Sequence, residues 1–363
     1  MKGDMMENKN SKQIKNKSKQ VFIMFLSLFI VCLILIGSGY LYVRGKIYRK
    51  TKSSVVTDVE TPVKPKEETI NYKEVDGITN VLLIGADGIN FDLEDQRSDS
   101  MIIATLDSNN KKVKLTSLYR DALVYIPGYG EHKMNESFSL GGPELVMDTI
   151  RYNYDINIEK YVMLNFVGFE SIIDQIGGIN IDVKEYQLNE LNKYIGVDTG
   201  RDTGGDNYSV EKPGLQTLNG KQALSYARIR KGVGDDFERA ERQREVLFEV
   251  AQKLQKTKPI KYFGIATKML DYLRTNMELS ECLNMAYTIY KFPSLDTEQL
   301  SIPVPELTVD DEVDGNLVLR MDRYENALIL NDFIFNDTLP DFILNRSTEK
   351  DESIYYEYEG FGE

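Results

Sequence analysis

Five arginines lie between residues 227 and 245 of a chain whose formal net charge is −13. They belong to the stretch ARIRKGVGDDFERAERQRE, in which Arg228 and Arg230 stand beside the apolar residues Ala227 and Ile229. A guanidinium group is planar and can donate two parallel hydrogen bonds to phosphate oxygens. The cluster therefore indicates a local site for a phosphate or pyrophosphate group in an otherwise acidic protein.

The second half of this stretch predicts a helix that begins at Asp236. Arg239 and Gln243 then follow at positions i+3 and i+7, with Arg242 beside them. One face of the helix would present a carboxylate, guanidinium groups and an amide together. Such a face suits a phosphate site with a nearby proton acceptor.

A simpler interpretation of the same helix is a solvated surface crossed by salt bridges. Glutamates alternate with the arginines over residues 238–245, and charge alternation of this kind is typical of exposed helices. For residues 239–244 taken alone, this interpretation is the more common one. It makes Arg244, one position beyond the shared face, a solvated residue.

Two carboxylates flank the first two predicted strands. Asp87 directly follows NVLLIGA (80–86), and Asp99 directly precedes SMIIATL (100–106). If a loop joins these strands, both carboxylates lie at one end of the sheet, where Mg²⁺ would take the remaining oxygens from water and phosphate. Aspartates at strand ends are also common in ordinary loops, so the spacing leaves both interpretations open.

Several other chemistries are excluded by composition. His132 is the only histidine, and the two cysteines, Cys32 and Cys282, lie far apart. Zinc sites and Ser-His-Asp catalysis are therefore not expected. Residues 1–52 carry a net charge of +9, which leaves −22 for the remainder. A domain that acidic is not expected to bind nucleic acid, because phosphate neutralisation supplies most of that affinity.

One segment, Val21–Val43, contains no charged residue and has the length of a membrane-spanning helix. We interpret it as an uncleaved single anchor, with the protein in the cell membrane, a cytoplasmic N-terminus and an extracellular C-terminal domain. The predicted organisation is a basic tail (1–20), the anchor (21–43), a juxtamembrane stalk (44–75), a catalytic domain (76–345) and an acidic tail (346–363).

The pattern of the domain indicates an α/β or α+β sandwich built on a central sheet. Strands are expected at 80–86, 100–106, 113–118 and 161–166, with a short strand after Gly177-Gly178. Helices are expected at 143–151, 168–176, from Asn219 to about Arg230, and from Asp236 to about Lys256. Residues 187–212 are polar and are interpreted as an exposed insertion, and helices are expected to dominate after Asn219.

The chain resembles the LytR-CpsA-Psr family in several stretches that occur in the family's order. They are NVLLIGAD (80–87), RSDS (97–100), SLYRDALVYIP (117–127), HKMNESFSLGGPE (132–144), YVMLNFVGFESIIDQIGGINIDV (161–183), PGLQTLNGKQALSYARIR (213–230) and DFERAERQ (236–243). An ordered set of this length is far more specific than any one motif.

The resemblance implies an α/β/α sandwich around a central mixed sheet, with an apolar core that holds a polyprenyl chain. It also implies a phosphotransferase that moves a glycopolymer from undecaprenyl pyrophosphate to a sugar hydroxyl of peptidoglycan. Mg²⁺, or alternatively Mn²⁺, would be held by Asp87 and Asp99. The pyrophosphate would be bound by Arg97, Arg120, Lys133, Arg228, Arg230, Arg239 and Gln243. The implied catalytic set is Asp236, Arg120 and Arg239, and the general base is either Asp236 or one of the metal-site aspartates.

Two other functions remain open from sequence. The same site would suit a pyrophosphatase that uses water as the acceptor, and a non-catalytic membrane regulator of envelope assembly is the second alternative. The sequence does not name the polymer, whose recognition would lie on loops such as 187–212.

Overall fold

The computed structural model describes residues 38–49, 74–86, 98–196, 208–229, 236–257, 264–265, 268–293, 297–313 and 315–346. The predicted basic tail, most of the predicted anchor Val21–Val43, and nearly all of the acidic tail lie outside these residues. Within the described part, no helix is both long and apolar enough to cross a membrane.

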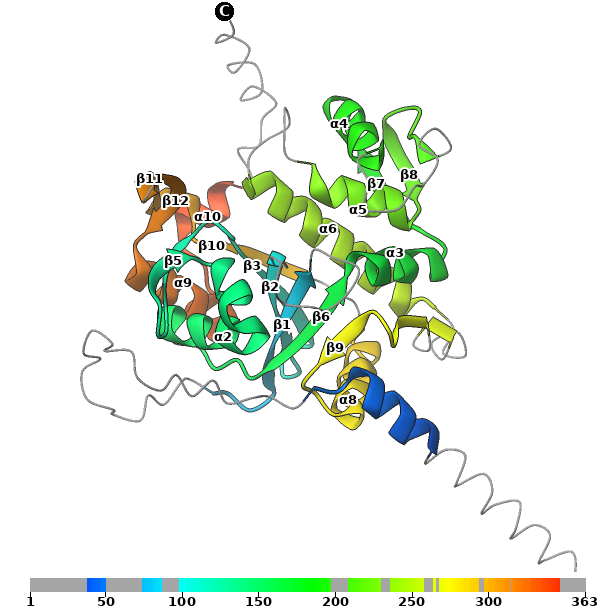
Figure 1. Cartoon of the computed structure of the whole chain (residues 1–363), viewed down its shortest axis with the longest axis horizontal. Coiled ribbons are helices and arrows are strands. Elements are labelled where there is room, and N and C mark those ends of the chain that lie inside the picture. The colour runs from blue at the N-terminus through cyan, green and yellow to red at the C-terminus, as the bar shows by residue number, and fades with distance from the viewer. Residues whose placement is uncertain are drawn as a thin grey trace, which may run out of the picture.

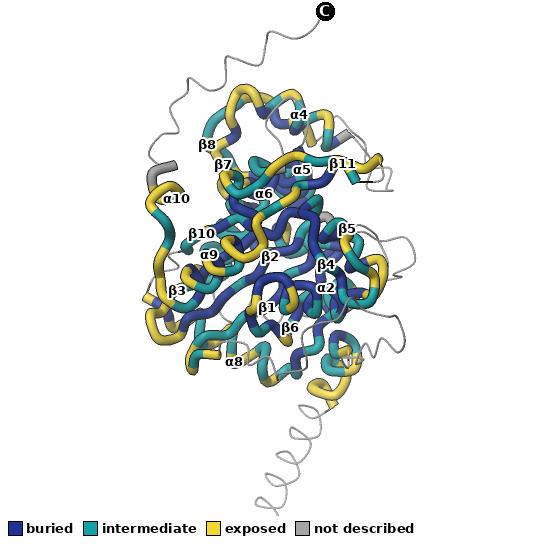
Figure 2. The backbone as a smooth tube through the Cα atoms, turned by 90° about the vertical axis from the view of Figure 1, so that its left-hand side faces the viewer, coloured by how far each residue is buried: buried dark blue, intermediate teal, exposed yellow. Residues whose placement is uncertain are grey.

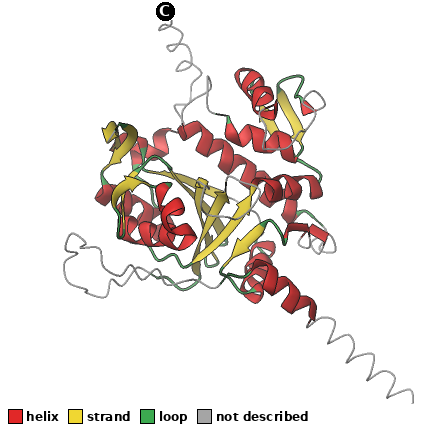
Figure 3. Ribbon diagram, viewed as in Figure 1, coloured by secondary structure: helices red, strands yellow, loops and turns green. Residues whose placement is uncertain are grey.

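A mixed six-stranded sheet forms the centre of the domain (Figures 1 and 3). Its strand order is β10 (Thr297–Ile302), β3 (Lys112–Leu118), β2 (Ser98–Asp107), β1 (Ile78–Ala86), β6 (Lys160–Asn165) and β9 (Leu273–Thr275). β1 is parallel to β6 and β10 is parallel to β3, while the other neighbouring pairs are antiparallel. The four strands expected from apolar runs are all present.

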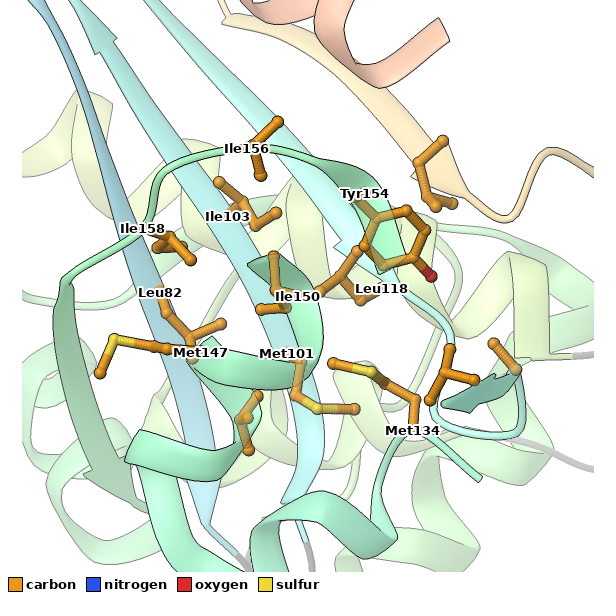
Figure 4. Close-up of a cluster of buried hydrophobic side chains, with 14 of the residues drawn as sticks. Leu82, Met101, Ile103, Leu118, Met134, Met147, Ile150, Tyr154, Ile156 and Ile158 are labelled. Carbon is orange, nitrogen blue, oxygen red and sulfur yellow. The ribbon is translucent and has the colours of Figure 1, made fainter. Parts of the chain in front are cut away.

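One face of the sheet is closed by α2 (Glu136–Tyr154) and α9 (Arg323–Asn336). Leu82, Met101 and Ile103 from the strands pack against Met147 and Ile150 of α2, as Figure 4 shows. The helix predicted from Pro143 is the second part of α2, because the backbone is non-helical at Gly141 and Gly142. Period-two alternation on the strands and helical spacing on α2 meet here to form a solid core.

The opposite face carries α3 (Phe166–Gln175), α5 (Gly220–Arg228) and α6 (Asp236–Gln255). These helices pack with the hairpin of β7 (Ile179–Val183) and β8 (Gly214–Leu218) into a second apolar cluster. The domain is therefore an α/β fold whose central mixed sheet has helices on both sides. The start of α6 at Asp236 agrees with the sequence prediction.

The interpretation of residues 187–212 as an exposed insertion is wrong for its first part. These residues begin inside α4 (Glu185–Gly196), whose Leu191 and Ile195 are buried in the second apolar cluster. Val210, after the stretch that is not described, is buried in the same cluster. The overall polarity of the segment conceals a few apolar positions at helical spacing.

Helices dominate the described residues after Asn219, as expected from the sequence, and this part of the chain also supplies several short strands. β9 and β10 are the two edges of the central sheet, and β11 (Thr308–Val313) pairs with β12 (Asn316–Met321). In the first half of the chain, β4 (Leu123–Ile126) and β5 (Gly130–Lys133) form another hairpin. Other elements in the described part of the chain include the helix α8 (Leu279–Tyr290), the 3₁₀ turn η3 (Pro305–Leu307), the helix α10 (Asp341–Arg346) and a helix over residues 38–47.

Arg244 fixes α6 to the sheet. Its side chain is buried, and it donates to Ser117 Oγ on β3 at 2.7 Å and to Ser301 Oγ on β10 at 2.8 Å. Its Nε donates to Gln299 Oε1, also on β10, at 2.9 Å. The prediction that Arg244 is solvated is wrong, because neutral oxygens of two distant strands replace water around the guanidinium group.

We expect Arg244→Ala to destabilise the domain. The change removes the buried hydrogen bonds that join α6 to β3 and β10 and leaves space beneath the helix, with a combined cost of about 2–4 kcal/mol. Denaturant unfolding of the detergent-solubilised chain measures the loss. The matched control is Arg320→Ala, which removes an exposed ion pair with Asp311 and should cost about 0–1 kcal/mol. Equal stability of the two variants would contradict the structural role of Arg244.

Candidate functional site

A pocket of about 510 Å³ lies between the central sheet and the helices α3, α5 and α6. Its wall is mostly apolar and comes from both layers. The apolar residues are Leu83, Ile84, Ile102, Val162, Leu164, Phe166, Phe169, Ile172, Leu224, Ala227, Leu247, Met269 and Leu273. This volume lies within the ordinary range for small-molecule sites.

The alternation of the central strands creates the pocket. On β6, Tyr161 and Met163 are buried against α2, whereas Val162 and Leu164 are only half-buried and line the pocket. On β1, Leu83 is likewise half-buried. Apolar side chains in the middle of a central sheet are normally covered completely. Their partial exposure here marks a space that is shaped for apolar material.

Four of the predicted phosphate-binding side chains line this same pocket. Arg120 follows β3, Arg228 is in the last turn of α5, and Arg239 and Gln243 lie one turn apart on α6. Leu247 continues the same face of α6 into the apolar wall. The pocket therefore joins an apolar wall to three guanidinium groups and an amide.

The start of α6 is held beside the end of β3 by an aromatic pair. The rings of Tyr119 and Phe237 meet edge to face with centroids 4.4 Å apart. Tyr119 precedes Arg120, and Phe237 follows Asp236, so this contact brings the two chain segments together. The positive end of the α6 dipole then lies near the arginines, where it favours an anion.

Arg228 is positioned by two neighbouring helices. Its guanidinium carbon lies 4.8 Å from the ring centroid of Phe166, at the start of α3. α5 approaches α3 closely at Gly220, where a Cβ atom would lie 2.1 Å from the carbonyl oxygen of Glu170. Only glycine fits there, and its place just after the Asn219 cap sets the register of α5.

A buried polar contact holds α5 on α6. The Tyr226 hydroxyl donates to Glu245 Oε2 at 2.8 Å. Burial raises the pKa of Tyr226 well above its ordinary value, and burial also raises the pKa of Glu245. The pair lies outside the pocket wall, so it fixes Arg228 relative to Arg239 without itself facing the pocket.

Lys133 is placed next to the site and does not line the pocket. Its Nζ is 2.8 Å from Asp121 Oδ1, and the Nε of Arg120 is 3.1 Å from the other oxygen of the same carboxylate. Asp121 thus joins the two cations and orients Arg120. Its negative charge also offsets part of the positive charge that Lys133 would bring to an anion.

The interpretation of residues 239–244 as a solvated salt-bridged helix is wrong. Arg239, Arg242 and Arg244 are all buried, with exposed fractions of 5%, 3% and 5%. Arg242 donates to the Ile229 carbonyl at 2.7 Å and lies 3.2 Å from Glu238. Arg239 lines the pocket, Arg242 binds the end of α5, and Arg244 binds the sheet.

Asp87, Arg97 and Arg230 lie outside the described residues, and only the backbone is described at Asp99 and Asp236. The β1–β2 register describes the chain neighbours of both predicted metal ligands. Gly85 pairs with Ser100 and Ala86 pairs with Ser98, so Asp99 is the extra residue of a β-bulge and Asp87 directly follows the same pair. Bulges often redirect a side chain next to an active site.

The pocket also contains residues that no sequence motif indicated. Asn165, Ser100, Phe166 and Tyr194 line it, and Asn165 caps α3 by accepting from the Gly168 amide at 2.9 Å. The change from strand to helix at Asn165-Phe166 was a detectable signal for a site at the strand end. Nothing in the sequence pointed to Tyr194, which lies on the helix mistaken for an exposed insertion.

An apolar pocket with arginines on its wall is suited to an amphiphilic anion: an apolar chain that ends in a strongly charged group. A family model described as the LytR_cpsA_psr family matches residues 42–332. The chain therefore belongs to the LytR-CpsA-Psr family, as its sequence stretches indicated.

The chain is similar to two named bacterial proteins over most of its length. It is 32% identical to the Staphylococcus aureus regulatory protein MsrR over 267 residues, 72% of this chain and 76% of MsrR. It is 31% identical to the Enterococcus faecalis polyisoprenyl-teichoic acid–peptidoglycan teichoic acid transferase TagU over 276 residues, 75% of this chain and 84% of TagU.

Solved structures of TagT, a Bacillus subtilis protein, share the fold. The structure of TagT with bound octaprenyl pyrophosphate lipid has a TM-score of 0.56 at 26% identity and covers 73% of this chain and 95% of TagT. The likeness extends over the central mixed sheet and its helices. It is therefore a likeness of the whole domain and not of one motif.

We expect Arg228→Ala to weaken the binding of inorganic pyrophosphate. A charge-assisted hydrogen bond contributes about 1.5–3 kcal/mol, so the dissociation constant should rise about tenfold or more. Arg228→Lys should restore only part of the affinity, because it keeps the charge and loses the planar fork. Isothermal titration calorimetry gives the constants, and Arg320→Ala is the control. Unchanged affinity in Arg228→Ala, with an unchanged circular dichroism spectrum, would remove Arg228 from the site.

Proposed function

We propose that the chain transfers a glycopolymer from undecaprenyl pyrophosphate to a sugar hydroxyl of peptidoglycan. The observation that carries the proposal is one pocket in which an apolar wall meets Arg120, Arg228 and Arg239. The apolar wall suits a polyprenyl chain, and the guanidinium groups suit the pyrophosphate that follows it. The transferase activity for which TagU is named and the lipid bound in TagT support this assignment.

In the proposed reaction, the acceptor hydroxyl oxygen attacks the phosphorus that carries the glycopolymer. The bond from that phosphorus to the bridging oxygen breaks, and undecaprenyl phosphate leaves with the electron pair. Arg120 and Arg239 are proposed to neutralise the charge on the phosphate oxygens, which is the largest contribution a protein makes to phosphoryl transfer. The hydroxyl proton is proposed to pass to Asp236, at the start of the helix that also carries Arg239.

We propose that Asp87 and Asp99 hold Mg²⁺, with Mn²⁺ as an alternative. The pocket wall supports this proposal, because it includes Ser100, which follows Asp99 in the chain, and Gly85, which lies two residues before Asp87. Mg²⁺ commonly takes one or two carboxylates from a protein and binds phosphate oxygens with its other positions. When bound, it would polarise a phosphate oxygen and offset developing charge.

We also propose that Val21–Val43 anchors the chain in the cell membrane, with the domain on the outer side. Residues 44–49, where the predicted stalk begins, support a short connection between anchor and domain. Arg44 donates two hydrogen bonds of 2.6 Å to Glu278, and the Arg49 amide donates to the Thr275 carbonyl at 2.7 Å. An anchored domain meets a membrane-bound donor at high effective concentration.

The product formed with and without an acceptor tests the transfer reaction. The purified chain is incubated with a lipid-linked glycopolymer and Mg²⁺, in the presence or absence of peptidoglycan fragments. We expect polymer-linked fragments and undecaprenyl phosphate only when the acceptor is present. Free phosphorylated polymer at the same rate without acceptor would make the protein a pyrophosphatase. Binding without any product would favour a regulator.

Asp87→Ala and Asp99→Ala should each abolish transfer while the domain stays folded. Loss of one carboxylate from a site that has two should nearly eliminate metal occupancy. Turnover is measured against Mg²⁺ concentration, and Mg²⁺ binding is followed separately by calorimetry. Asp311→Ala, a change of an exposed carboxylate on β11, is the control. Normal Mg²⁺ dependence in both variants would show that the metal assignment is wrong.

A further inference from the structure

The helix α8 carries an outward-facing stripe of large apolar and aromatic side chains. Leu283, Tyr287 and Tyr290 have exposed fractions of 61%, 56% and 50%, and none of the α8 residues is buried. Their spacing of four and three residues places them on one side of the helix. A stripe of this kind on one amphipathic helix is typical of a binding surface.

A second exposed group lies beside α8, on the helix over residues 38–47. Tyr40, Leu41 and Tyr42 have exposed fractions of 38%, 66% and 62%. This helix is held to the start of α8 through Arg44 and Glu278. Figure 1 shows this helix (blue) beside α8, at the opposite end of the domain from α4, and Figure 2 also shows α8 at the end opposite α4. The two groups are called the α8 face below.

The sequence indicates what covers this face. Tyr40, Leu41 and Tyr42 are the last part of the uncharged stretch Val21–Val43, which is proposed above to cross the membrane. A bilayer entered by that stretch must lie next to the helix over residues 38–47, and α8 is bound to that helix. This step depends on the proposed anchor and is independent of the transfer reaction.

The chemistry of the face matches the boundary between lipid and water. A tyrosine side chain has an apolar ring and a polar hydroxyl, and such residues collect at membrane interfaces. The Nζ of Lys291, at the end of α8, lies 4.2 Å from the ring centroid of Tyr287. Lysines at such positions keep the ammonium group in water while their carbon chain covers apolar surface.

We infer that α8 lies along the outer surface of the membrane, with Leu283, Tyr287 and Tyr290 inserted among the lipid headgroups. The partner is therefore the lipid bilayer, and the domain is bound to it at a second place besides the anchor. Helices of this amphipathic type insert their apolar side about 5–10 Å into the interface.

This arrangement would give the pocket a short route to the membrane. Leu273 of β9 lines the pocket, and Thr275 of the same strand pairs with Tyr48, next to the helix over residues 38–47. A pocket of about 510 Å³ has the size for a drug-sized part of a ligand, so a long polyprenyl chain must continue outside it. With α8 on the bilayer, that remainder stays in lipid.

A single tryptophan reporter tests the inference, because the chain has no tryptophan of its own. The full chain carrying Tyr287→Trp is reconstituted in phosphatidylcholine vesicles, with or without bromine on the upper acyl chain as a quencher. The control is Tyr324→Trp, an exposed tyrosine (70%) at the start of α9, on the part of the domain away from α8. Tyr290→Trp is a second reporter on the same face.

We expect brominated lipid to reduce the fluorescence of Tyr287→Trp and Tyr290→Trp by about twofold or more, as an interfacial depth implies. Tyr324→Trp should show no reduction. Equal responses at α8 and at Tyr324 would overturn the inference, as would a blue-shifted but unquenched α8 reporter, which indicates contact with protein. A chain that fails to float with the vesicles would overturn both the anchor and the inference. Transfer activity plays no part in this readout, so its failure would be seen separately.

Discussion

The position of α6 depends on one buried guanidinium group, that of Arg244. A charge taken from water is costly unless polar atoms surround it, and here Ser117, Ser301 and Gln299 supply them from two adjacent strands. Burial lowers the pKa of Arg244 from its ordinary value, because removing the charged guanidinium group from water is unfavourable. Because these oxygens occur at one place on the sheet, α6 has one favourable position. Arg239 and Gln243, on the neighbouring face, are then directed to the pocket.

One face of the central sheet packs against α2, and the opposite face lines the pocket. Leu82 of β1 is completely buried against α2, whereas its neighbour Leu83 is half-buried and lines the pocket. Covering apolar surface yields about 25 cal/mol for each Å², so the packed face stabilises the fold. On the pocket side, part of the apolar surface stays exposed after folding, and it is covered only when an apolar ligand enters. A proposed polyprenyl chain would thus be bound by surface that folding leaves uncovered, and the rigid packed face would keep the pocket open.

The elements that could be predicted from the sequence are those that local residue patterns indicate. Apolar runs located β1, β2, β3 and β6, and the residue pattern around Asp236 located the start of α6. Arg228 and Arg239 could be assigned to the same pocket because both lie near the ends of predicted helices, and helix ends can be recognised from neighbouring residues. The burial of Arg244 could not be predicted, because its partners on β3 and β10 lie 55 to 127 residues away in sequence. α4 was missed because Leu191 and Ile195 are isolated apolar residues in a polar stretch. Their burial in the second apolar cluster is evident only in the folded structure.

The edge strand β9 links the site to the rest of the chain. Its Leu273 faces the pocket, and its Thr275 is paired with Tyr48 and accepts from the Arg49 amide. An edge strand with free backbone groups is normally a liability, and here the chain's own residues 48–49 cover part of it. The same contact ties the segment that follows the proposed anchor to the wall of the pocket. If the anchor enters the bilayer as proposed, backbone pairing and the Arg44–Glu278 ion pair set the orientation of the pocket relative to the membrane. A long flexible stalk is then not required to bring the lipid to the arginines.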